Sequence, residues 1–279
     1  MALTASSRDS GKEFDFTIKD FERVRTLIYQ RAGISLSDSK QEMVYSRLAR
    51  RLRATGISSF SEYLNELERG QDADEMVAFT NALTTNLTSF FREEHHFPLL
   101  AEFASKLKEP ISVWCSASST GEEPYSIAIT LCEAYGKMNP PARIIATDID
   151  TNVLKTAANG VYGMDRLEKM SPERVKKFFL RGKGSNDGQV RVRQELRDMI
   201  EFKQLNLLSD SWPVSGTFDV IFCRNVMIYF DKPTQKKILQ RFAPMLKPHG
   251  LLFVGHSENF SYLTDIFQLR GKTVYEVSR

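Results

Sequence analysis

From residue 111 onward, short apolar runs alternate with helical stretches, and this alternation constrains the fold more than any other feature of the sequence. The apolar runs are rich in branched side chains and occupy residues 111–115, 143–147, 199–202, 218–223 and 251–254. Helical patterns lie between them at about 123–135, 151–159 and 233–246. Strands that alternate with helices form βαβ units and a parallel sheet covered by helices. We therefore predict an α/β domain over residues 110–279, with a β-hairpin near its end at 267–277.

Residues 14–87 carry a pattern typical of helices alone. Phe21, Val24, Leu27 and Ile28 recur at the i, i+3, i+4 spacing of one helix face. Further helices are predicted at about 39–55, 60–67 and 73–83. Because no segment here has a strand pattern, we predict an all-helical N-terminal domain. A connecting segment is expected at 88–109, and a disordered tail over residues 1–13.

One stretch interrupts the alternation of the second domain. Residues 178–197 contain the turn-rich KGSNDG followed by QVRVRQEL, in which apolar and polar residues alternate with period two. Such alternation is typical of a half-buried strand. We predict a small antiparallel β-subdomain inserted at 178–197.

The composition indicates a soluble globular protein, with 42% hydrophobic and 26% charged residues. A net charge of +3 is too small by itself to indicate a nucleic-acid-binding protein. Cys115, Cys132 and Cys223 form neither a C-x-x-C motif nor a disulfide framework, which favours a reducing cytoplasm. The four histidines share no metal-ligand spacing with them, so we expect no metal. With neither a signal-peptide pattern nor an apolar run of about 20 residues, we expect a cytoplasmic protein that does not insert into the membrane.

Residues that directly follow the predicted strands are the candidate ligand-binding residues, because ligands of open α/β sheets bind beyond the carboxyl ends of the strands. After the first strand, the small residues 116–121 open a helix that begins with Glu122 and Glu123. Carboxylates at a helix N-terminus would repel a phosphate, which otherwise binds there. They also complement the helix dipole, so a purely structural role for either residue stays open.

The second and third strands are followed by further candidates. Asp148 is placed to accept hydrogen bonds from the two ribose hydroxyls of an adenosine. Asp150 fits better as the N-cap of the next helix. Asn206 and Leu207 suit the edge of an adenine, although Asn206 also fits an ordinary turn.

Arg224 and Asn225 directly follow the fourth strand. A charge beside a buried strand is costly without partners, which favours a functional role. The chain lacks both the G-x-G-x-x-G of dinucleotide dehydrogenases and the G-x-x-x-x-G-K-[ST] of nucleotide hydrolases. An adenosine ligand whose other end is uncharged or cationic, such as S-adenosylmethionine, is compatible with both Glu123 and Asp148.

Five contiguous segments resemble a known family. They are NALTTNLTSFFRE from Asn81, ASSTGEEPYSIAI from Ala117, ATDID from Ala146, FCRNVMIYFD from Phe222 and LLFVGHSENF from Leu251. Together they resemble the bacterial chemotaxis receptor methyltransferases, the CheR family. The resemblance implies an all-helical N-terminal domain followed by a Rossmann-like class I S-adenosylmethionine-dependent methyltransferase domain with a small inserted antiparallel β-subdomain. The run SASSTGEE departs from the acid-x-Gly-x-Gly loop of methyltransferases at large.

The resemblance also implies the reaction and the residues that carry it. The implied reaction transfers a methyl group from S-adenosylmethionine to receptor glutamates, yields S-adenosylhomocysteine and uses no metal. Arg92 and Tyr229 would border the methyl-transfer point as catalytic residues. The cofactor-binding residues would be Asn86, Thr88, Arg92, Glu123, Asp148, Asn206, Leu207, Cys223, Arg224 and Asn225. A glutamate carboxylate is already ionised at neutral pH, so this reaction needs no general base.

Two surfaces are candidates for contact with a methyl-accepting receptor. On the predicted helix 39–55, a basic arc is either a solvated face or, as in the family, a docking surface for an acidic helical bundle. Its docking candidates are Arg47, Arg50, Arg51 and Arg53. In some family members the β-subdomain binds a peptide at the receptor C-terminus by strand addition, the alternative being a purely structural hairpin. The residues suited to such a tether are Arg181, Gly188 and Arg191.

Two other functions are compatible with the sequence. A nucleic-acid methyltransferase would place its acceptor loop at 225–229, but its N-P-P-Y form is missing and the basic arc has no interleaved aromatic residues. A receptor-bound adaptor without activity is disfavoured by the presence of Arg92, Asp148 and Tyr229. We expect a monomer that is recruited to its receptor and binds no nucleic acid.

Overall fold

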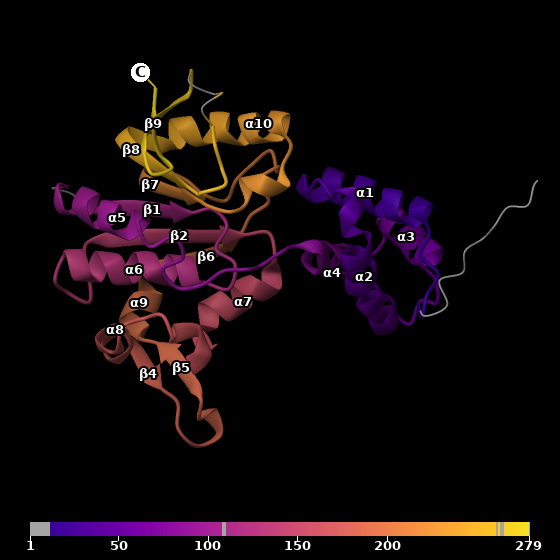
Figure 1. The fold of residues 1–279 in the computed structure, drawn as a ribbon, viewed down its shortest axis with the longest axis horizontal. Coiled ribbons are helices and arrows are strands. Elements are labelled where there is room, and N and C mark those ends of the chain that lie inside the picture. The colour runs from indigo at the N-terminus through magenta and orange to yellow at the C-terminus, as the bar shows by residue number, and fades with distance from the viewer. Residues whose placement is uncertain (1–11, 108–109, 261, 263–264, 279) are drawn as a thin grey trace, which may run out of the picture. The chain divides into compact units, whose positions relative to one another are not determined.

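The computed structural model describes residues 12–107, 110–260, 262 and 265–278. The chain divides into two compact units, Met1–Thr84 and Thr85–Arg279 (Figure 1). Apart from Lys12 and Glu13, the tail that we predict to be disordered lies outside the described residues. None of the helices in these ranges has the length and apolar character that a bilayer span requires.

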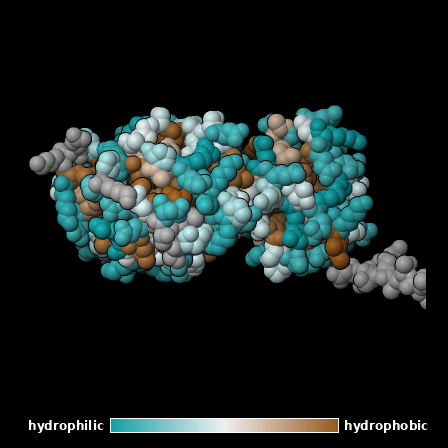
Figure 2. Space-filling model, turned by 90° about the horizontal axis from the view of Figure 1, so that it is seen from above, coloured by the Kyte–Doolittle hydropathy of each residue, from teal (hydrophilic) through white to brown (hydrophobic). Residues whose placement is uncertain are grey.

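The first unit is helical. It contains α1 (Ile18–Ala32), η1 (Asp38–Lys40), α2 (Gln41–Thr55), α3 (Phe60–Arg69) and α4 (Ala73–Leu83). Thr17 and Asp20 form a capping box that begins α1, while α1, α2 and α3 each end at a glycine in the left-handed conformation. One apolar face of each helix is buried, with Val24, Leu48 and Leu64 fully inaccessible. The face of this unit seen in Figure 2 is mostly hydrophilic. The all-helical prediction is confirmed.

The second unit is built on a seven-stranded sheet. Its strands are β1 (Ile111–Cys115), β2 (Ala142–Asp148), β6 (Ile200–Gln204), β7 (Phe218–Cys223), β8 (Leu246–Val254), β9 (Phe267–Gly271) and β10 (Val274–Val277). Their order across the sheet is β6-β2-β1-β7-β8-β10-β9. The first five are parallel, whereas β10 runs antiparallel to both β8 and β9. The predicted parallel sheet and terminal hairpin are both present.

Helices cover both faces of this sheet. α5 (His96–Ser105) and α6 (Glu122–Ala134) pack on one face, and α10 (Lys232–Phe242) packs on the other (Figure 1). Successive side chains of a strand point to opposite faces, so Val113 joins the core beneath α5 and α6 while Trp114 joins the core beneath α10. Every residue of β7 is buried, as expected for a central parallel strand.

The β-subdomain is a three-stranded antiparallel sheet in the order β3-β5-β4. Its strands are β3 (Val161–Gly163), β4 (Phe179–Arg181) and β5 (Gln189–Val192). Between and after them lie η2 (Met164–Leu167), α8 (Pro172–Phe178), η3 (Gly184–Asn186) and α9 (Gln194–Asp198). The small antiparallel sheet is confirmed, but β3 lies outside the predicted range 178–197. A strand of three residues is too short to show a period-two pattern in the sequence.

Candidate active site

The candidate site lies beyond the carboxyl ends of β1, β2 and β7. The chain leaves β1 to form β2 and β6 on one side, then crosses to β7 and β8 on the other. This reversal of strand order is where open α/β sheets bind their ligands. Segment 85–93, which precedes α5, contributes side chains to the same edge through hydrogen bonds to the β1 and β2 loops.

The loop between β1 and α6 is held tightly against its neighbours. Gly121, the N-cap of α6, has a φ of 100°, and a Cβ there would lie 2.8 Å from the Cβ of Ala157. Glu122 is fully buried, accepts a hydrogen bond of 2.6 Å from the Thr120 hydroxyl and pairs with Arg166. Its partners therefore lie within the protein, which supports the structural reading of Glu122.

Asp148 ends β2 and is nearly buried. Its carboxylate accepts hydrogen bonds from the backbone N–H groups of Ser119, at 2.8 Å, and Asp150, at 3.0 Å. Burial raises the pKa of Asp148 to about 6, against the opposing effect of these two donors. Asp150 caps α7 (Thr151–Asn159), as predicted, and also accepts a hydrogen bond of 2.8 Å from the Asn86 side chain. The Asn86 side chain is thus bonded to the loop that follows β2.

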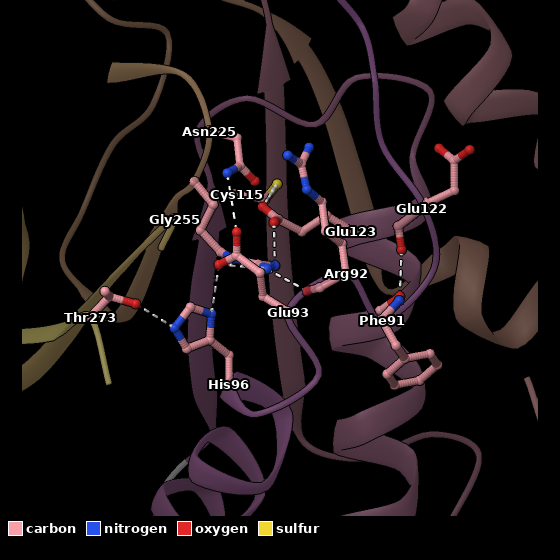
Figure 3. A network of polar contacts seen from close by, with 12 residues as sticks. Phe91, Arg92, Glu93, His96, Cys115, Glu122, Glu123, Asn225, Gly255 and Thr273 are labelled. Atoms are coloured by element: carbon pink, nitrogen blue, oxygen red, sulfur yellow. Dashed lines mark hydrogen bonds and ion pairs between the residues drawn. The ribbon is translucent and has the colours of Figure 1, made fainter. Parts of the chain in front are cut away.

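Arg224 is the centre of a buried charge network. Figure 3 labels three of the residues that contact it, Arg92, Glu93 and Glu123. The Arg224 side chain is 1% exposed and lies 2.7 Å from the Glu123 carboxylate and 3.3 Å from that of Glu93. It also donates to the carbonyl of Arg92. The partners that a charge beside a buried strand requires are therefore present, and two of them are acids on different segments.

The two acids of this network have opposite pKa shifts. Burial raises the pKa of Glu123 despite the nearby Arg224 and a hydrogen bond of 3.1 Å from the Cys115 thiol. Burial also acts to raise the pKa of Glu93, but hydrogen bonds from His256 and the charge of Arg224 outweigh it and hold this pKa at about 2. Glu93 is therefore firmly ionised.

The strand end after β7 carries Asn225, which adopts a left-handed conformation with φ 57°. Its side chain donates to Glu93 at 3.2 Å, so it joins the network around Arg224. Tyr229 follows in the short helix η4 (Met227–Tyr229) and is partly exposed. The side chain of Arg92 is half-buried and donates to the Leu87 carbonyl at 2.8 Å.

The remaining predicted cofactor residues make contacts within the fold. Leu207 is 6% exposed and belongs to the core beneath α10. The Asn206 side chain accepts a hydrogen bond from the Leu208 N–H at 3.0 Å, which forms a turn. Cys223 is fully buried, and burial raises the pKa of its thiol well above the usual range. The Thr88 carbonyl accepts a hydrogen bond of 3.0 Å from Arg166.

Three residues of this edge were not predicted from the sequence: Glu93, His256 and Glu258. Glu93 and His256 make a hydrogen bond of 2.8 Å, and Glu258 is buried against the β7 loop. All three lie in segments that carry the family resemblance, Glu93 in TTNLTSFFRE and both His256 and Glu258 in LLFVGHSENF. Their roles depend on contacts with residues more than 30 positions away, which no local pattern reveals.

Glu93, His95 and His96 form a group that could in principle hold a metal ion, with one ligand atom from each within 4.8 Å of the others. The guanidinium of Arg224, 3.3 Å from Glu93, would repel a cation at this position. Burial and this same charge lower the pKa of His96 to about 4. We therefore assign Glu93 and His96 to the Arg224 network rather than to a metal site.

Comparison with known proteins identifies the family. Residues 19–84 match the CheR methyltransferase all-alpha domain, and residues 86–276 match the CheR methyltransferase SAM binding domain. The chain belongs to the CheR methyltransferase family. A chemotaxis protein methyltransferase of Salmonella typhimurium is 57% identical over 259 residues, covering 93% of this chain and 90% of that protein. Chemotaxis protein methyltransferase 2 of Pseudomonas aeruginosa is 53% identical over 275 residues, covering 98% of both chains.

This CheR methyltransferase is therefore an S-adenosylmethionine-dependent chemotaxis protein methyltransferase that yields S-adenosylhomocysteine. The residues at the sheet edge fit such a cofactor. Asp148 is an acid suited to hydroxyl groups but not to phosphate. In the loop between β1 and α6, the hydroxyl of Ser118 is fully buried and has no hydrogen-bond partner among the described residues. A buried polar atom of this kind is suited to a ligand's polar group.

Proposed function

We propose that this methyltransferase esterifies glutamate side chains of a methyl-accepting chemotaxis receptor. The observation that supports the proposal is that the carboxylates at the sheet edge already have hydrogen-bond or ion-pair partners. Glu93 and Glu123 are both paired with Arg224, and Asp148 accepts two backbone N–H groups. Within the described part of the chain, none of these acids is free to act as a general base. An acceptor that is already anionic, such as a glutamate carboxylate, suits this arrangement because it has no proton to lose.

Bound S-adenosylmethionine supplies an electrophilic methyl group on a cationic sulfonium. In the proposed site, Asp148 accepts hydrogen bonds from the ribose hydroxyls, and the remaining predicted cofactor residues complete the binding. Arg92 orients the glutamate carboxylate with its planar guanidinium, and Tyr229 positions the acceptor beside it. The protein's contribution is to exclude water from the carboxylate and align it with the methyl carbon, rather than to move a proton.

Transfer of labelled methyl groups from S-adenosylmethionine to receptor-containing membranes tests this proposal. We expect label on the receptor that mild alkali releases as methanol, as a carboxyl methyl ester requires. Alkali-stable label, or label on added nucleic acid, would contradict esterification. An absence of turnover despite cofactor binding would favour a receptor-bound adaptor.

The pair formed by His256 and Glu93 favours one alternative. A carboxylate bonded to one imidazole nitrogen is the arrangement that holds a histidine as a general base. His256 is 68% exposed at its side chain, and its Nδ1 lies 2.8 Å from Glu93. A base would be needed for a neutral amine or hydroxyl acceptor, such as one on a nucleic acid. Dependence of turnover on His256 therefore separates the two acceptor classes.

The basic arc on α2 is proposed to dock the receptor's acidic helical bundle, but its four arginines are not equivalent. Arg51 pairs with Glu75, and Arg47 donates to the carbonyl oxygens that end α4. Arg53 pairs with Glu13 at 2.8 Å, both being about half exposed. Arg50 is exposed, and its hydrogen bond goes to the Ser46 carbonyl of its own helix. We therefore assign docking mainly to Arg50 and Arg53, and a structural role to Arg47 and Arg51.

Replacing Arg50 and Arg53 together by alanine tests this assignment. We expect the KM for receptor to rise about ten-fold while the Kd for S-adenosylhomocysteine is unchanged, since surface charge acts mainly on encounter with a charged partner. Arg69→Ala, which removes an exposed charge from α3, is the matched control and should leave the KM unchanged. If the KM for receptor is unchanged in the double variant, the basic arc on α2 is a solvated face and not a docking surface.

The β-subdomain is proposed to tether the receptor's C-terminal peptide. Its edge strand β4 exposes Leu180 and Arg181 beside a groove of about 800 Å³. Arg191 lies opposite Leu180 on β5, and Gly188 precedes β5 with a φ of 79° and open space around its Cα. Such an edge can add a peptide strand by main-chain hydrogen bonds, with the arginines as charge anchors.

Replacement of Arg181 and Arg191 by alanine tests the tether. We expect weaker binding of a peptide from the receptor C-terminus and slower methylation of intact receptor, because a tether raises the local concentration of enzyme. Methylation of a receptor without that peptide serves as the control and should not change. Equal slowing on both receptors would contradict a tether.

A further inference from the structure

Glu258 has no role in the proposed reaction, yet it has an unusual environment. It lies in the LLFVGHSENF segment after β8, and it is 4% exposed. Its carboxylate accepts four backbone N–H groups: those of Gly255 at 2.6 Å, Asn225 at 3.0 Å, Val226 at 3.0 Å and Met227 at 2.8 Å. Three of these donors are consecutive residues of the segment that follows β7. A single buried carboxylate therefore holds the backbone where Asn225 takes its left-handed conformation.

An ionised carboxylate is the side chain suited to this position. Successive backbone N–H groups around a left-handed residue form a concave site for an anion. A carboxylate accepts on both oxygens, whereas an amide of the same shape would direct an NH₂ group at one pair of donors. Burial raises the pKa of Glu258 in spite of the four donors, so keeping its charge here is costly. A costly buried group that holds a strained backbone is typical of a functional site.

The same segment is held from its other side by Gln235 of α10. The Gln235 amide donates to the carbonyl oxygens of Met227, at 2.9 Å, and Phe230, at 3.0 Å. Its own oxygen accepts the Tyr262 hydroxyl at 2.6 Å. Glu258 thus accepts hydrogen bonds from the N–H groups of the loop 225–230, and Gln235 donates hydrogen bonds to carbonyl oxygens of the same loop. Tyr229 lies within this doubly held loop.

We propose that Glu258 is a positioning residue for methyl transfer, which fixes the backbone of residues 225–227 and thereby places Asn225 and Tyr229. The inference rests on the proposed roles of these two residues in cofactor binding and acceptor positioning. Close packing supports it, because a Cβ added at Gly255 would lie 2.4 Å from the Asn225 side-chain nitrogen. Gly255 therefore blocks movement of Asn225 on that side, and the hydrogen bonds to Glu258 and Gln235 hold the rest of the loop.

Glu258→Gln is the direct test, because it keeps the shape and removes one acceptor. We expect the amides of residues 225–227 to exchange with deuterium at least about ten-fold faster, while β1 and β7 keep their protection. Turnover per folded molecule should fall by about ten-fold or more with the KM for receptor unchanged. Glu102→Gln, the same change at an exposed site on α5, is the control and should match the wild type.

Gln235→Glu provides a second variant if Glu258→Gln folds poorly. It keeps the oxygen that accepts from Tyr262 but removes the amide donors to Met227 and Phe230, so it loosens the loop without changing Glu258. We expect the same direction of change in exchange and in turnover. Wild-type exchange at residues 225–227 in both variants, or equal loss of protection across the whole unit, would overturn the proposal.

Coupling to Asn225 and Tyr229 shows whether the effect acts through the loop. If it does, adding Glu258→Gln to a variant that carries both Asn225→Ala and Tyr229→Phe should reduce turnover by no more than about two-fold further. A further loss as large as in the single variant would overturn the positioning role. If the wild type forms no alkali-labile ester, the proposed function fails. The exchange measurement then still decides whether Glu258 holds the loop.

Discussion

Replacing Asp148 by asparagine should make the apo-protein slightly more stable while weakening its affinity for the cofactor. The burial that raises the pKa of Asp148 from 3.8 to about 6 means that its charge destabilises the fold at pH 7. At about 1.4 kcal/mol for each pKa unit, this cost is about 3 kcal/mol. Asparagine removes the charge but directs an NH₂ group at one of the two N–H donors, which costs about 2 kcal/mol. We therefore expect a net gain of about 1 kcal/mol in the free energy of unfolding.

Cofactor affinity should change in the opposite direction. Two ribose hydroxyls donating to a carboxylate contribute about 1.5–3 kcal/mol each, and asparagine can accept only one of them well. A loss of about 2 kcal/mol or more corresponds to a Kd at least about 30-fold higher. Isothermal titration with S-adenosylhomocysteine measures this Kd. Asp198→Asn, the same change at an exposed position in α9, is the matched control and should leave this Kd unchanged.

Urea unfolding followed by tryptophan fluorescence measures the stability, since Trp114 and Trp212 are the chain's two tryptophans and both lie in the second unit. The folded state keeps a proton on Asp148 up to a higher pH than the unfolded state does. The wild type therefore loses stability relative to the variant as pH rises from about 3.8 to about 6. The advantage of Asp148→Asn should be full above pH 6 and absent below about pH 4. A variant that is at least 2 kcal/mol less stable at pH 7, or one that binds cofactor normally, would refute this reasoning.

Three further predictions follow from the same edge of the sheet. Glu93→Gln should lower the free energy of unfolding by about 2 kcal/mol at pH 7, a value discounted for partial solvent screening. The pKa of Glu93 is depressed from 4.5 to about 2, so the difference in urea stability between the wild type and Glu93→Gln should shrink as pH falls from 4.5 to about 2. A difference that stays constant over this pH range would contradict the prediction. Gly121→Ala should cost about 2 kcal/mol or more by thermal denaturation, because its Cβ would meet Ala157 at a φ of 100°, and normal stability would show that the loop can relax. His256→Gln should keep turnover within about three-fold if the acceptor is a carboxylate, whereas a loss of about a hundred-fold in a methyl-transfer assay would indicate a general base.

Local patterns account for much of what the sequence predicts correctly. Burial of one helix face gives the i, i+3, i+4 spacing of apolar residues in α1. Burial of both faces of a strand gives the continuous branched runs of β1, β2 and β7. Both patterns can be seen directly in the sequence. The rule that parallel strands present their carboxyl ends at one edge was enough to predict that Asp148 and Arg224 lie at the same edge of the sheet. The prediction that Asp150 caps α7 also needed only neighbouring residues.

Elements without a local signature were missed or shortened. β3 has three residues, and the first half of β8 carries Pro248 and Gly250, which in a sequence indicate a turn. β3 is a strand because all three of its residues pair with β5, and β8 begins as early as Leu246 because that residue pairs with Phe218 of β7. In these cases tertiary pairing overrides a weak or contrary local preference.

The order of residues along the chain is enough to show which residue types follow each strand, and hence that an acid, an arginine and an amide lie at one edge of the sheet. The partner of each side chain is known only from the folded arrangement. Glu122 turns to Arg166 while its neighbour Glu123 turns to Arg224, and Glu258 reaches a loop more than 30 residues away in the chain. The physical reason is that a buried charge is stabilised by an opposite charge or hydrogen-bond donor that lies close to it in the folded protein. The number of residues between the two partners does not affect this energy, so no sequence pattern shows which residues pair.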